Sequence, residues 1–122
     1  MPDQTMTAPE PTEIRLKRAE RLLEIAFSDG ATFTLPAEYL RVESPSAEVQ
    51  GHSPDQRQLV AGKQTVGITS LEPNGHYALR ITFDDGHSTG IYSWDYLYRL
   101  GREYPFRWAA YLKAIEAAHL TR

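Results

Sequence analysis

Apolar and polar residues alternate in several short runs along the chain, which is the period of half-buried β-strands. In the N-terminal part these runs predict strands over residues 13–17, 21–27 and 31–35. Ser28-Asp29-Gly30 lies between the second and third runs and has the residues of a tight turn, so these two strands are expected to form a hairpin. Pro36 suits the first position of a short helical turn over residues 35–40.

The same alternation returns in the second half of the chain and then gives way to a helical pattern. It predicts strands over residues 65–72, 77–83 and 88–92, joined by turns at Pro73-Asn74-Gly75 and Asp84-Asp85-Gly86. Ser93 suits a helix N-cap, and Gly101 is expected to end that helix. Pro105 opens a last helix, in which Trp108, Leu112 and Ile115 fall on one face.

Strands that precede helices, without βαβ alternation, indicate an α+β fold. We expect a small antiparallel β-sheet built from hairpins and followed by two C-terminal helices. The proline-rich, polar residues 1–12 read as a disordered tail, and residues 13–122 as a single domain. Residues 43–63 are rich in Ser, Pro, Gly and Gln and are expected to form an irregular loop, of a length that is usually functional or mobile.

Composition narrows the class of protein. The 122 residues carry a formal net charge of -3, which argues against non-specific binding of nucleic acid. No apolar run approaches the roughly 20 residues that span a bilayer, and the N-terminal residues lack the pattern of a signal peptide, so a cytoplasmic location is expected. The chain has no cysteine, which removes disulfides, thiolate metal ligands and cysteine nucleophiles together.

Little in the chain is typical of catalysis. It contains no G-x-S-x-G elbow, no phosphate-binding glycine motif and no serine with a base nearby in sequence, so we expect that it is not an enzyme. The histidines are scattered, without the spacing of paired metal ligands, at His52, His76, His87 and His119. His87 follows Asp84 and Asp85, and two interpretations remain open: a turn histidine partnered by a neighbouring carboxylate, or a functional group.

Aromatic residues cluster between Tyr92 and Tyr111, and most are expected in the core. Tyr98 and Tyr104 flank a basic group formed by Arg99, Arg102 and Arg107. That junction is the exposed patch that the sequence predicts.

Two segments, residues 40–52 and 81–97, resemble the gamma-butyrobetaine hydroxylase-like N-terminal domain family. The run from His87 through Gly90, Ile91, Tyr92, Trp94 and Tyr96 to Leu97 is the most specific element, and the resemblance extends over about residues 13–118. It implies the fold of that domain without the oxygenase domain that follows it in the hydroxylases.

The resemblance also implies the position of a zinc site, which in the hydroxylases has three cysteines and one histidine. His87 matches the histidine, and Ser44, Ser46 and Val49 stand where the thiolates would be. Serine hydroxyls are poor zinc ligands and valine is none, so we expect no cofactor, with zinc or iron implied by the resemblance alone.

These observations favour a non-catalytic accessory or protein-interaction module with an unidentified protein partner, and neither nucleic acid nor membrane. The loop 43–57 and the surface around His87 are expected to bind the partner, through the charged and polar side chains of Glu48, His52, His87, Arg99 and Arg102. The alternative is a zinc- or iron-binding protein linked to iron or iron–sulfur handling. Its ligands would be His87, His52, Glu48 and Asp85.

Overall fold

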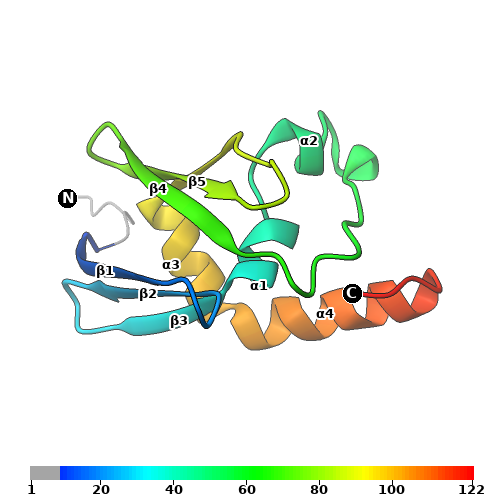
Figure 1. Ribbon diagram of the computed structural model, residues 1–122, viewed down its shortest axis with the longest axis horizontal. Coiled ribbons are helices and arrows are strands. Elements are labelled where there is room, and N and C mark those ends of the chain that lie inside the picture. The colour runs from blue at the N-terminus through cyan, green and yellow to red at the C-terminus, as the bar shows by residue number, and fades with distance from the viewer. Residues whose placement is uncertain (1–8) are drawn as a thin grey trace, which may run out of the picture.

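A computed structural model describes residues 9–122 and shows two three-stranded antiparallel sheets with helices after them (Figure 1). The first sheet consists of β1 (Pro11–Lys17), β2 (Leu22–Phe27) and β3 (Thr32–Pro36), and the second of β4 (Ile68–Asn74), β5 (Ala78–Phe83) and β6 (Gly90–Ser93). The helices are α1 (Ala37–Val42), α2 (Ala47–Gln50), α3 (Trp94–Arg102) and α4 (Tyr104–Ala117), with a 3₁₀ turn at Pro54–Gln56. The α+β prediction is confirmed, with two sheets in place of one.

The N-terminal boundary differs slightly from the prediction. Residues 1–8 of the expected tail lie outside the described residues. β1 begins at Pro11, two residues before the predicted strand, because the backbone pairing extends that far: Pro11 lies opposite Phe27. The Ser28 N–H also donates to the Glu10 carbonyl at 2.8 Å.

Both predicted Asp-Gly hairpin turns form. Gly30 and Gly86 have φ values of 92° and 93°, in the left-handed region that favours glycine. In the second turn the Phe83 N–H donates to the His87 carbonyl at 2.9 Å, so His87 lies opposite Phe83, the last residue of β5. This turn therefore fixes the position of the histidine that the sequence singled out.

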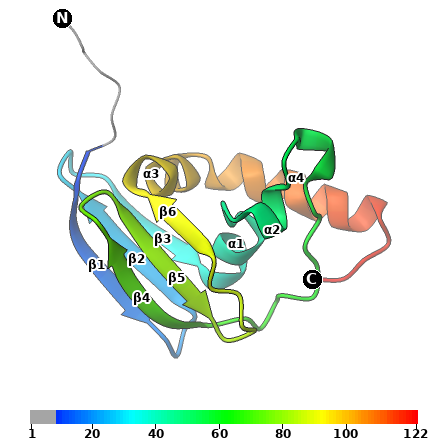
Figure 2. The same ribbon diagram turned by 90° about the horizontal axis from the view of Figure 1, so that it is seen from above.

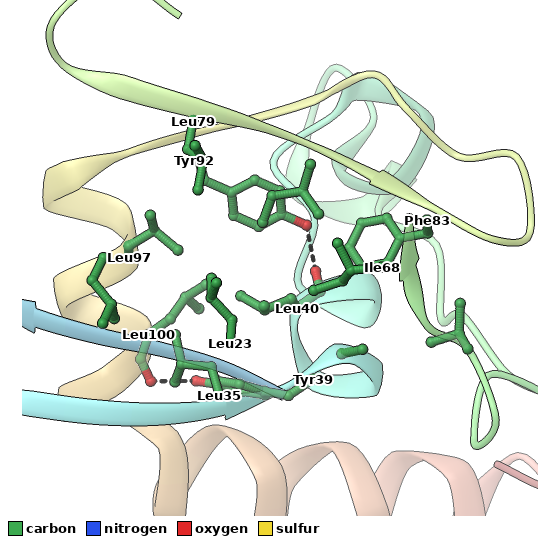
Figure 3. Packing of buried hydrophobic residues seen from close by; sticks show 14 of the residues in the cluster. Leu23, Leu35, Tyr39, Leu40, Ile68, Leu79, Phe83, Tyr92, Leu97 and Leu100 are labelled. Atoms are coloured by element: carbon green, nitrogen blue, oxygen red, sulfur yellow. Dashed lines mark hydrogen bonds between the residues drawn. The ribbon is translucent and has the colours of Figure 1, made fainter. Parts of the chain in front are cut away.

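The hydrophobic core lies between the two sheets, which are stacked one over the other (Figures 1 and 2). Leu23 and Leu35 point into it from the first sheet, and Leu79 and Phe83 from the second (Figure 3). Alternate residues of β2 are buried, as a sheet with one covered face requires.

Two buried tyrosines connect the helices to this core. The Tyr92 hydroxyl donates to the Leu40 carbonyl at 2.5 Å, and the Tyr39 hydroxyl donates to the Leu100 carbonyl at 2.7 Å (Figure 3). Both rings have no exposed surface, so each hydroxyl needs the partner it has. These bonds hold α1 against β6 and α3, and thereby place the chain that follows α1.

α3 begins as predicted but continues past the expected end. Ser93 is its N-cap, and its hydroxyl accepts from the Tyr96 N–H at 3.1 Å. Gly101 lies inside the helix instead of terminating it, and a Cβ built there would be 2.4 Å from the Phe33 ring. The glycine is therefore required for close packing of α3 on β3, and the helix ends at Arg102, one residue beyond the predicted stop.

α4 packs through a slightly different face from the one predicted. Tyr111 and Ile115 are buried with Val42, whereas Leu112 is 39% exposed. Trp108 packs against this second small cluster from its edge. Within residues 9–122, no helix is long and apolar enough to cross a membrane.

Residues 43–63 are more ordered than the predicted irregular loop. Ser46 caps α2, and its hydroxyl accepts from the Glu48 N–H at 3.1 Å. The Gln50 amide donates to the Ser44 carbonyl at 2.8 Å, and the Gln58 N–H donates to the Val49 carbonyl at 2.7 Å. Short-range hydrogen bonds of this kind give a polar segment a defined shape without a regular element.

Candidate functional site

A serine and a glutamate of residues 43–57 meet a histidine of the second sheet's last turn at the edge of the core. Ser44 follows α1, Glu48 is on α2, and His87 follows the β5–β6 turn. Ser44 Oγ lies 2.9 Å from His87 Nε2, and His87 Nδ1 lies 3.0 Å from Glu48 Oε1. The order hydroxyl, imidazole, carboxylate is that of a hydrolase triad.

This arrangement is closed to solvent at its serine. Ser44 has no exposed surface, and its Oγ also accepts from the Ser46 N–H at 3.2 Å. On its other side, a Cβ built at Gly90 would lie 2.6 Å from the same oxygen. A nucleophile must approach a carbonyl carbon to about 3 Å, and here protein atoms fill that space. The contacts of His87 with Ser44 and Glu48 instead join the segment after α1 to the second sheet.

Asp84 and Asp85, the carboxylates predicted to partner the His87 ring, do not hold it. Asp85 accepts from the His87 backbone N–H at 3.0 Å and forms ion pairs with Arg41 at 2.8 Å and Lys63 at 2.6 Å. The ring nitrogen instead contacts Glu48, whose side chain is 63% exposed. The partner is therefore a carboxylate distant in sequence, not one of the adjacent turn.

The environment lowers the pKa of both His87 and Asp85. Burial of the ring and then the positive charge of Arg41 lower the pKa of His87, while Glu48 and Asp85 oppose this effect in part. For Asp85, burial alone would raise the pKa, but hydrogen bonds from Lys63, the His87 N–H and Arg41 together hold it well below its ordinary value. Both groups are therefore more stable in the folded protein in their deprotonated forms.

These pKa shifts predict a two-step loss of stability on acidification. A lowered pKa gives stability that is present above the unfolded-state pKa and is lost as the pH falls, so the His87 contribution should begin to fall below about pH 6.5. The Asp85 contribution should follow below about pH 4. Urea unfolding at a series of pH values measures both steps. His87→Gln should remove the upper step alone, and a free energy of unfolding that rises between pH 7 and 5.5 would contradict the prediction.

The residues at the implied zinc position do not fit a zinc ion. Ser44 already binds the His87 nitrogen, Ser46 caps α2 and contacts Thr89 Oγ1 at 2.6 Å, and Val49 is 2% exposed and apolar. Zinc sites of this kind need thiolates or several imidazoles. Within residues 9–122, no three His, Asp or Glu side chains gather as the alternative ligand set would require.

A basic hollow is formed where residues 43–57 meet α3 and α4. It is open, has a volume of about 270 Å³, and is lined by Pro45, Gln50, Arg57, Tyr96, Arg99 and Arg107. The Arg99 and Arg107 guanidinium carbons lie 5.8 and 5.9 Å from the centre of the Tyr96 ring. We call this feature the arginine hollow.

The arginine hollow divides the predicted basic patch. Arg102 points elsewhere, over the Tyr98 ring at 5.9 Å, and Tyr98 donates to Asp29. Of the predicted partner-binding residues, Arg99 lines the hollow, while Glu48 and His52 are exposed on the adjacent segment and His87 is buried. Arg57 was not among the predicted residues, because its partner Glu43 is fourteen positions away.

The two stacked sheets, the buried Ser44–His87 contact and the helical cover define a small α+β module. The family model described as "Gamma-butyrobetaine hydroxylase-like, N-terminal" matches residues 14–98. The chain belongs to this family.

Solved structures share the fold. Two NMR solution structures are 44% and 46% identical to the chain, cover 93% and 100% of it and 90% of their own lengths, and superpose with TM-scores of 0.81 and 0.82. A crystal structure from Acidithiobacillus ferrooxidans, described as a protein of unknown function of the DUF971 family, is 41% identical. It covers 78% of this chain and 98% of its own, with a TM-score of 0.66. No curated protein matches the chain.

Proposed function

We propose that the protein is a non-catalytic interaction module that binds a protein partner through residues 43–57 and the adjoining arginine hollow. The observation that carries this proposal is the contrast between the two polar features of the molecule. The triad-like contact is closed to solvent at Ser44, whereas the arginine hollow is open. Chemistry needs access to a reactive atom, but recognition needs an ordered, exposed surface.

The structure of residues 43–57 supports this role. His87 of the second sheet fixes the segment through Ser44 and Glu48, and Arg107 of α4 fixes it through Glu43. The Arg57–Glu43 ion pair ties its two ends to each other. Its exposed residues, among them Glu48 and His52, are thus presented on a shaped backbone. A preorganised surface binds with less loss of conformational entropy than a flexible one.

Affinity capture from the native cell, with comparison of surface variants, tests the proposal. A specific partner should be retained by the wild-type protein and lost, or at least ten-fold reduced, with His52→Ala/Arg99→Ala, because rim and anchor contacts are removed together. Tyr77→Ala/Arg80→Ala, on the exposed β4–β5 hairpin, is the matched control and should retain it. Equal recovery of every captured protein by both variants would overturn this assignment of the surface.

A further inference from the structure

We propose that the arginine hollow recognises a carboxylate side chain on an acidic segment of the partner protein. This inference rests on the proposed interaction function and specifies its chemistry. All charged residues that line the hollow are arginines, although the whole chain has a net charge of -3. A locally positive surface on a negatively charged protein attracts an acidic ligand to this place.

One carboxylate of the chain already binds two of the arginines that line the hollow. Glu43 Oε1 accepts from Arg57 Nη2 at 3.0 Å and from Arg107 Nη1 at 3.0 Å. Glu43 is buried, and its backbone carbonyl accepts from the Tyr96 hydroxyl at 2.5 Å. Its carboxylate therefore holds these two guanidiniums in fixed positions.

The guanidiniums retain binding capacity after these internal contacts. The Glu103 carboxylate accepts a hydrogen bond from Arg107 Nε–H at 2.8 Å. The Glu43 carboxylate accepts one hydrogen bond from each of Arg57 and Arg107. Each guanidinium has five N–H donors in a planar fork that matches a carboxylate. Glu43 and Glu103 therefore occupy only some of the donors of Arg57 and Arg107, and the residues that line the hollow include no carboxylate.

Size and charge favour a protein side chain over other anions. The volume of about 270 Å³ lies below the roughly 300–1,000 Å³ of most small-molecule sites, and the hollow is open on one side. Three arginines around one hollow do not supply the row of cations that neutralises a nucleic-acid backbone. A larger depression of about 360 Å³ on the outer face of the first sheet offers no such cation, because its Arg15 pairs with Glu13 at 2.7 Å.

Fluorescence anisotropy with a defined probe tests the inference. The probe is a fluorescein-labelled peptide of alternating glutamate and glycine, and the control peptide has glutamine in place of glutamate. The wild-type protein should bind the glutamate peptide at least ten-fold more tightly than the glutamine peptide. Arg99→Gln should weaken glutamate-peptide binding about ten-fold, the range of one charge-assisted hydrogen bond. Arg57→Gln provides a second variant at the same hollow.

Arg102→Gln is the matched control, since Arg102 is on the same helix but outside the hollow, and it should change binding less than two-fold. Equal binding of both peptides, or equal effects of Arg99→Gln and Arg102→Gln, would overturn the inference. Competition by succinate or inorganic phosphate at the peptide's own concentration would also overturn it in favour of a free anion. Tighter binding of a ten-nucleotide uridine oligomer would overturn it in favour of nucleic acid.

The peptide result separates the two proposals. If the peptide fails to bind while a captured native partner depends on His52 and Arg99, the interaction function stands and the carboxylate inference falls. If the peptide binds with the expected arginine dependence, the carboxylate inference stands whatever the capture experiment shows.

Discussion

Ile81→Ala is expected to lower the free energy of unfolding by about 2–5 kcal/mol, the usual cost of a large-to-small change in a packed core. Ile81 has no exposed surface and lies in β5, the central strand of the second sheet. Its side chain belongs to the cluster between the sheets, where Leu23 and Leu35 face it from the first sheet. Removing it leaves a cavity, because the close-packed residues around it relax only in part.

Urea unfolding of Ile81→Ala and Ile91→Ala measures this effect with a matched control. Ile91 is on the neighbouring strand but is 45% exposed, so its truncation should change the free energy of unfolding by only about 0.5 kcal/mol. Similar losses in the two variants would mean that β5 is not the centre of a core between stacked sheets.

His87→Ala should cost roughly 2–4 kcal/mol, which combines the cavity left by a buried ring with the loss of a buried hydrogen bond at Ser44. Ser44 keeps the contact from the Ser46 N–H, and the exposed Glu48 can be hydrated, so the cost should not reach that of an unpaired buried charge. Thermal or urea unfolding measures the change. His52→Ala, at an exposed histidine of the same segment, is the control and should be near neutral.

A chelator distinguishes hydrogen bonding from metal binding at His87. EDTA should leave the wild-type midpoint unchanged, because Ser44 and Glu48 already bind both ring nitrogens. A wild-type midpoint that falls with EDTA, together with a His87→Ala midpoint that does not, would show instead that a metal stabilises this site.

The strands could be predicted from the sequence because their information is local. Alternation marks each buried face, and Asp-Gly marks each of the two tight turns, so register and pairing follow from neighbouring residues. The end of α3 could not be predicted this way. Gly101 has the residue type of a helix stop, but its function depends on Phe33 in another strand.

The site depends on contacts between distant residues, and the sequence predicted it only in part. The family resemblance implied that Ser44 and His87 are neighbours, and they lie 2.9 Å apart although 43 positions separate them. Pattern grouped Arg99 and Arg107 in one basic patch, but it gave no sign of the Glu48 contact or of Arg57 beside them. Arg57 and Arg107 are brought together by Glu43, a pairing that exists only once α4 has packed beside α1.

The way residues 43–58 are fastened has a consequence for motion. Between Ser44 and Gln58 the chain is held mainly by side-chain hydrogen bonds and ion pairs, with Val49 as its buried apolar anchor, whereas the sheets share a continuous core. Local opening costs least where little apolar area is buried. This segment should therefore detach and re-close as a unit while the sandwich stays folded. A ligand that contacts both this segment and α3 would then make the opening rarer. Amide exchange would slow throughout the segment, including at residues that the ligand does not contact.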